Sequence, residues 1–168
     1  MNPKFIAYIA SSIDGIIATG KTKLPDWTSK EDWQFLQGEL KKAEAFVMGG
    51  NTFKATKRLS RRDNTFVLTR SVKSTKKEGK VTFVNPQGAN LKAFLLKFKR
   101  VAVLGGGQTY RFMIDKKMID EIYWTIEPLI LGRGIKIFSS GKSTFRLKLL
   151  SHKKLNSEGT LILHYKVI

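Results

Sequence analysis

The sequence has 168 residues, of which 42% are hydrophobic and 26% are charged, proportions that are typical of a globular protein with a substantial core. It contains no cysteine, which excludes disulfides and thiolate chemistry, and its two histidines argue against a multi-histidine metal site, so we expect no metal. The 31 Lys and Arg residues exceed the 13 Asp and Glu residues and give a net charge of +18.

This positive charge is spread along the whole chain and forms no basic tail. That distribution favours a solvated, lysine-rich surface over a dedicated nucleic-acid site, although a basic nucleic-acid-binding protein is the alternative from a different class. We find neither an apolar run long enough for a membrane span nor a signal peptide, and we therefore expect no membrane partner and a cytoplasmic location. No linker or repeat divides the sequence, so we expect one domain over residues 1–168, as a monomer or a homodimer.

The chain opens with a predicted buried strand over residues 4–10, followed by a turn at Asp14-Gly15 and a polar loop that ends at Trp27. Thr28 and Glu31 have the spacing of a capping box, which predicts a helix from Thr28 to about Lys42. The helical spacing of apolar residues predicts that this helix buries Trp33, Leu36, Leu40 and Ala43.

Two residues of this region have both a structural and a functional interpretation. Asp32 is either a first-turn carboxylate that complements the helix dipole or an acid at the edge of a pocket, partly desolvated and able to exchange a proton. Trp27 is either a plug over the core or the wall of a pocket.

Two predicted strands, over residues 45–48 and 101–104, run into glycines and then into a helix. Such a junction directs free backbone N–H groups and a positive dipole end at one place, which suits a phosphate, and the alternative is a tight turn without a ligand. The G-x-G-x-x-G spacing is absent. Two junctions could hold the two ends of a dinucleotide, at Gly49, Gly50, Asn51 and Thr52 and at Gly105, Gly106, Gly107, Gln108, Thr109 and Tyr110.

Between the junctions the sequence predicts a basic loop over 58–64, strands over 65–70 and 81–84, a charged loop over 73–80 and a helix over 91–98. Thr69 and Arg70, at the end of the first of these strands, could bind a phosphate monoester. After a helix over 109–116 come strands without long helices between them, which predicts antiparallel additions to a parallel sheet. They cover residues 120–128, 135–138, 145–152 and 161–167, with a hairpin turn at 155–160.

This order of elements, the two glycine junctions and the Trp27–Asp32 pair resemble the dihydrofolate reductase family over nearly the whole chain. The resemblance implies an α/β fold with three layers (α/β/α) and a mixed, mostly parallel central sheet with antiparallel C-terminal strands. It implies reduction of dihydrofolate by hydride transfer from NADPH. Asp32 would hold the pterin and favour its protonated form, Thr125 would bond the far carboxylate oxygen, and Trp27 would hold a water over the site.

The same resemblance implies a binding role for further positions. Ile9, Ala10 and Ile17 would line the slot against the nicotinamide, and the loop from Ile17 to Asp26 would act as a lid. Leu36 and either Arg61 or Arg62 would contact the folate. Gly50 stands where an arginine is common in the family, so Thr69 and Arg70, with Gln108, would bind the adenosine 2′-phosphate.

Two stretches, Ser12–Gly15 and Pro128–Gly134, resemble the riboflavin-pathway reductases of this fold more than dihydrofolate reductase. The alternative substrate is therefore a ribosylaminopyrimidine phosphate, with the same NADPH cofactor and a small-molecule substrate in either case.

Overall fold

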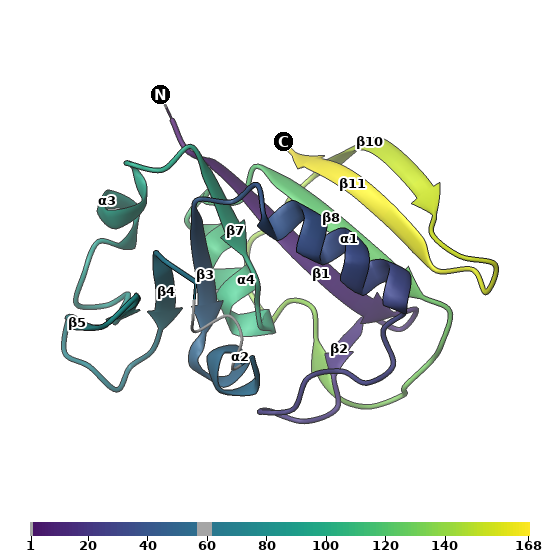
Figure 1. The fold of residues 1–168 in the computed structure, drawn as a ribbon, viewed down its shortest axis with the longest axis horizontal. Helices are drawn as coiled ribbons and strands as arrows, with labels where there is room; N and C mark the ends of the chain where they lie inside the picture. The colour runs from purple at the N-terminus through teal and green to yellow at the C-terminus, as the bar shows by residue number, and fades with distance from the viewer. Residues whose placement is uncertain (1, 57–61) are drawn as a thin grey trace.

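The computed structural model describes residues 2–56 and 62–168. Within them, nine strands form one mixed sheet in the order β10-β11-β8-β1-β7-β3-β4-β6-β5 (Figure 1). The strands of this sheet are β1 (Lys4–Ser12), β3 (Ala45–Gly49), β4 (Thr65–Leu68), β5 (Thr75–Glu78), β6 (Val81–Val84), β7 (Arg100–Val103), β8 (Glu121–Glu127), β10 (Leu147–Lys154) and β11 (Leu161–Val167).

The central strands β8, β1, β7, β3, β4 and β6 all run parallel, as their near-continuous apolar sequences require once both faces of the sheet are covered. Helices α1 (Lys30–Leu40) and α2 (Gly50–Ala55) contribute to the core cluster on one face. Helices α3 (Leu91–Leu95) and α4 (Gly107–Asp115) contribute to the cluster on the other face. The predicted three-layer, mostly parallel fold is confirmed.

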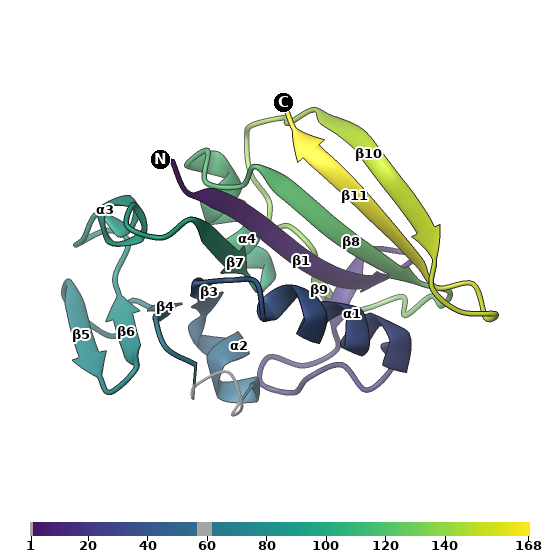
Figure 2. The ribbon, with the colours of Figure 1, turned by 45° about the horizontal axis from the view of Figure 1, so that its top comes forward.

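The C-terminal strands differ in part from the prediction. β8 is parallel to β1, since α4 carries the chain back across the sheet, whereas β11 and β10 are antiparallel and form the outer edge in Figure 2. The predicted strand over 135–138 is shorter, because β9 (Ile135–Lys136) pairs only with β2 (Ile16–Ala18) in a separate two-stranded sheet. The expected charged loop over 73–80 contains β5, which pairs with β6 and keeps its four side chains exposed.

Helix α1 begins one residue later than the capping box predicts. Ser29, and not Thr28, is the N-cap, because its Oγ accepts a hydrogen bond from the backbone N–H of Asp32 at 3.2 Å. Leu40 is buried as expected, but the prediction for Trp33 is wrong, since this side chain is 43% exposed. The first turn of the helix lies near the ends of β1 and β8 (Figure 1).

No helix among the described residues is long and apolar enough to cross a membrane. The predicted basic loop over 58–64 falls largely outside the described residues.

Candidate active site

The carboxyl ends of parallel strands surround a groove of about 910 Å³. Such edges are the usual ligand sites of open α/β sheets, because loops and helix N-termini converge there. The residues predicted for the cofactor that line the groove are Ala10, Ile17, Gly49, Gly50, Asn51, Thr52, Thr69, Arg70, Gly106, Gly107, Gln108, Thr109 and Tyr110.

The two glycine junctions contact each other at the floor of the groove. The Gly49 N–H donates to the Gly105 carbonyl at 2.7 Å, across the adjacent strands β3 and β7. A Cβ atom at Gly49 would lie 2.8 Å from the Thr109 hydroxyl, so only glycine fits this approach. Gly105 has a φ of +89°, and its peptide bond to Gly106 is cis.

Helix α4 begins at the second junction without a capping side chain, because its N-cap is Gly106. By contrast, Ser29 and Asn90 cap α1 and α3 with their side chains. An uncapped N-terminus leaves backbone N–H groups and the positive dipole end open to the groove, where Gly106 and Gln108 also lie. This end of α4 can therefore accept an anionic group.

Arg70 also lines the groove and stands two residues after the end of β4. Its side chain is exposed, while Thr69 and Ser71 hydroxyls pair with each other at 2.9 Å. A guanidinium with two adjacent hydroxyls offers the donors that a phosphate monoester takes.

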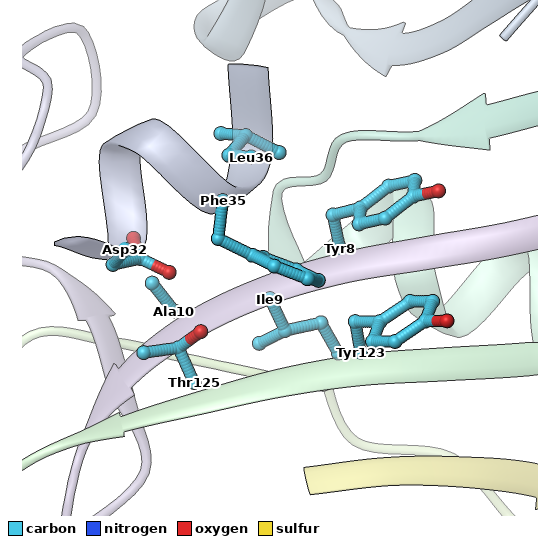
Figure 3. Close-up of a pocket in the computed structure, with 8 residues that line it drawn as sticks. All are labelled: Tyr8, Ile9, Ala10, Asp32, Phe35, Leu36, Tyr123 and Thr125. Carbon is cyan, nitrogen blue, oxygen red and sulfur yellow. The ribbon is translucent and has the colours of Figure 1, made fainter. Parts of the chain in front are cut away.

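A narrow notch of about 30 Å³ opens beside the groove and shares Tyr8, Ala10, Asp32 and Leu36 with it. In Figure 3, Asp32 and Thr125 lie together at one end of the notch, Tyr8 and Tyr123 lie at the other, and Phe35 reaches down from α1 between them. The notch is too small for a ring system, so a substrate that reaches Asp32 has to lie mainly in the groove.

The Asp32 side chain is only 7% exposed. Burial raises the pKa of its carboxyl to about 6, while a hydrogen bond with Thr125 lowers it and the negative charge of Glu127 raises it. A carboxylic acid with a pKa near neutrality can hold a proton or a cationic heterocycle at physiological pH.

Four predicted site residues lie differently from the rest. The Trp27 Nε1 is buried without a partner among the described residues, and Trp27 is absent from the described lining of both cavities. Arg62 donates to the Leu40 carbonyl and to the Gln37 side chain, both at 3.4 Å, and it is also absent from the lining of the notch and of the groove.

The other two predicted residues lie next to these cavities. Ile9 lines the notch, although its side chain belongs to the core on the opposite face of the sheet. Gly105 is absent from the lining of the groove and packs against the Tyr110 ring. Arg61 is outside the described residues.

The sequence interpretation missed several lining residues. Tyr8 stands two residues before Ala10 on β1, and Tyr123 stands two residues before Thr125 on β8. Because residues two apart in a strand lie on the same face, both tyrosines lie on the face that Asp32 covers. Trp33 and Leu24, with 43% of each side chain exposed, line the groove beside Asp32. Exposed large apolar side chains at a cavity mouth are a signal of ligand contact.

The residues present fit a dinucleotide. Two facing glycine junctions leave room for a close approach to the backbone, an uncapped helix end and Arg70 offer sites for phosphates, and the volume admits a second, smaller molecule. Among the described residues, no group of three or more His, Cys, Asp or Glu side chains could hold a metal ion.

The groove, the two glycine junctions and the buried Asp32 carboxyl are those of an α/β protein whose ligand site lies at the carboxyl ends of the parallel strands. The family model described as dihydrofolate reductase matches residues 5–132, and the chain belongs to this family.

Individual proteins that resemble this chain have different descriptions. A Bacillus subtilis (strain 168) chain described as uncharacterized protein YwjB is 29% identical in an alignment of 178 residues in length that covers 98% of this chain and 98% of that one. The pyrimidine reductase-like protein of Corynebacterium diphtheriae superposes with a TM-score of 0.77 at 18% identity, over 99% of this chain and 92% of that one. Dihydrofolate reductase from Enterococcus faecalis, solved in complex with NADP(H) and RAB-propyl, superposes with a TM-score of 0.69 at 19% identity, over 98% of this chain and 96% of that one.

Proposed function

We propose that this chain is an NADPH-dependent oxidoreductase that reduces a C=N bond of a nitrogen heterocycle or its sugar substituent, and that its substrate is a ribosylaminopyrimidine phosphate. The observation that carries the oxidoreductase proposal is the buried Asp32 carboxyl, which sits where the notch meets a groove with two glycine junctions.

The nicotinamide, when bound, supplies the hydride. Ala10 and Ile17 would pack against its ring, and the α4 end with Gly106 and Gly107 would hold the pyrophosphate. Arg70 and Thr69 would bind the 2′-phosphate that distinguishes NADPH from NADH.

Asp32 would bind the donor edge of the heterocycle and share a proton with it, with Thr125 fixing the second carboxylate oxygen. Protonation of the C=N nitrogen makes its carbon a better hydride acceptor, and the partly water-excluded position of Asp32 strengthens this effect.

Two observations favour the pyrimidine phosphate as the substrate. The stretches that resemble riboflavin-pathway reductases are bonded to each other, since the Asp14 carboxylate accepts from the Gly132 N–H at 2.7 Å and from the Leu131 N–H at 3.1 Å. In addition, Lys21 lines the same groove as Asp32 and offers a cation to a substrate phosphate, while Lys23, which also lines it, pairs with Asp26 at 3.1 Å. The likeness to a pyrimidine reductase-like protein agrees with this choice.

Dihydrofolate is the second candidate, and the pairing of Asp32 with Thr125 favours it. A side-by-side assay separates the two. NADPH oxidation is followed with each substrate at equal concentration, and we expect a higher kcat/KM for the pyrimidine phosphate. If only dihydrofolate is turned over, the second candidate is established. If NADPH is not oxidised with either substrate, the proposed chemistry is contradicted.

A further inference from the structure

Glu127 is a second buried carboxylate close to Asp32, with 3% of its side chain exposed. Its Oε1 accepts from the Ser29 backbone N–H, and its Oε2 accepts from the Thr160 hydroxyl, both at 2.6 Å. Within residues 2–56 and 62–168 it makes no ion pair. A buried charge without a cation is costly even when hydrogen-bonded, which points to a use beyond stability.

The position of Glu127 connects three elements of the fold. It stands two residues after Thr125 on β8, so both side chains lie on the sheet face that α1 covers. Through the Ser29 N–H it holds the residue whose side chain caps the Asp32 N–H at 3.2 Å. Through Thr160 it reaches the β10–β11 hairpin, where Asn156 also bonds Glu31 of α1 at 3.4 Å. The Glu127 carboxylate therefore connects the start of α1 both to β8 and to the β10–β11 hairpin.

Glu127 is also a negative charge that acts on the Asp32 carboxyl. The other ionisable groups that line the notch and the groove near this point are tyrosines, which are neutral at about pH 6 because a phenol titrates far above it, and lysines. They are Tyr8, Tyr110 and Tyr123 from the sheet and α4, and Lys21 and Lys23 from the groove wall. Among the charges, that of Glu127 acts on the Asp32 carboxyl in the direction that retains a proton.

We infer that Glu127 is a positioning residue of the site, which fixes the start of α1 so that Asp32 lies over Thr125. In this position the negative charge of Glu127 also favours the protonated form of the Asp32 carboxyl. The inference rests on the proposed function for its role in the reaction. A proton taken from solvent is shared by Asp32 and the substrate nitrogen, and after the hydride reaches the carbon it stays on that nitrogen, leaving Asp32 as the carboxylate.

The test is Glu127→Gln in the full chain, with Thr160→Val as the matched control. The glutamine can accept from the Ser29 N–H with its oxygen and donate to the Thr160 hydroxyl with its nitrogen, so the packing is kept while the charge is lost. Thr160→Val removes one hydrogen bond to Glu127 and keeps the charge.

Carboxyl-carbon NMR measures the protonation midpoint of Asp32 without any substrate, with the resonance assigned by its loss in Asp32→Asn. We expect Glu127→Gln to lower this midpoint by about half a pH unit or more, because a like charge is removed from a buried site. The fall of kcat/KM with rising pH should move to lower pH by the same amount. We expect Thr160→Val to leave the midpoint within about 0.2 units of the unsubstituted protein.

An unchanged Asp32 midpoint in folded Glu127→Gln would overturn the inference. Another outcome is a lowered Asp32 midpoint in Glu127→Gln together with an unsubstituted protein that does not oxidise NADPH with either substrate. That result would support the positioning role and contradict the proposed function, so a failure of the inference and a failure of the proposed function are distinguishable. If Glu127→Gln does not fold, carboxyl-carbon NMR of Glu127 in the unsubstituted protein tests the inference instead. A protonated Glu127 carboxyl at about pH 6 would overturn the inference, because the charge on which it depends would be absent. An ionised Glu127 carboxylate would support it.

Discussion

Replacing Asp32 by asparagine should stabilise the protein at neutral pH while it abolishes most of the reduction. Burial raises the pKa of the Asp32 carboxyl from 3.8 to about 6. The folded state therefore binds the proton more tightly than the unfolded state does. This contribution to stability is fully present below the unfolded pKa and is lost as the pH rises through the folded pKa.

The size of the effect follows from the shift. A difference of about two pKa units, at about 1.36 kcal/mol for each unit, amounts to about 3 kcal/mol between about pH 4 and about pH 8. Because the side chain is almost completely buried, solvent screens little of this energy. Asparagine has nearly the same shape and carries no charge at any pH, so it avoids the loss.

Urea unfolding of both proteins across this pH range measures the prediction. The unfolding free energy of Asp32→Asn minus that of the unsubstituted protein should rise by up to about 3 kcal/mol with pH, mostly between the unfolded pKa of about 4 and the folded pKa of about 6, and level off above it. Titrating groups that do not interact with Asp32 cancel in this difference. A difference that does not change with pH would refute the reasoning, because Asp32 would then ionise as easily in the folded chain as in water. In the same variant, hydride transfer at neutral pH should fall by about a hundredfold or more.

Three further changes test the groove. Arg70→Ala should weaken NADPH binding about tenfold or more and leave NADH almost unaffected, whereas Arg133→Ala on the exposed turn should change neither; equal loss for both cofactors would place the 2′-phosphate elsewhere. Gly107→Ala should cost about 1–3 kcal/mol of unfolding free energy, because its Cβ would collide with the Lys136 carbonyl, while Gly38→Ala, with open space around it in α1, should gain about 0.5–1 kcal/mol. Trp33→Ala should raise the substrate KM about three- to tenfold with little change in kcat, and an unchanged KM would show that the substrate does not stack there.

Patterns that depend on local sequence predicted most of the fold. The apolar runs that end in Gly49 and Gly105 indicated buried strands followed by helices, and both junctions line or underlie the groove. The position of Asp32 alone allows two interpretations, because it is equally consistent with a simple first-turn carboxylate, and only the resemblance to the dihydrofolate reductase family favours the functional one. Its burial depends on β8, which is distant in the chain.

The errors arise where long-range contacts override local signals. Thr28 has the better capping-box spacing, but Glu127 holds the Ser29 N–H and so decides which residue caps α1. Helical spacing assigned Trp33 to the core, yet the core facing this part of α1 is interrupted by the groove. The β5 strand has no apolar residue, and it forms because its neighbour β6 supplies a partner for its backbone.

The contacts of Asp14 limit which part of the N-terminal loop can close over a ligand. Asp14 binds the N–H groups of Leu131 and Gly132, and the Ile13 N–H binds the Leu129 carbonyl at 2.9 Å. Just beyond, β2 pairs with β9, and the Lys136 carbonyl of β9 lies so close to Gly107 that a Cβ atom there would collide with it.

Residues 13–18 are thus tied through the 129–137 segment to the second glycine junction, which places Ile17 in the groove in a fixed relation to α4. Within the described part of the chain, residues 19–26 lack such bonds apart from the exposed Lys23–Asp26 ion pair. We therefore expect any closing movement of this loop to begin after Ala18. Under the proposed function, such a movement would carry Lys21, Lys23 and Leu24 toward the substrate while Ile17 stays in place beside α4, so it would act on substrate binding and leave the cofactor undisturbed.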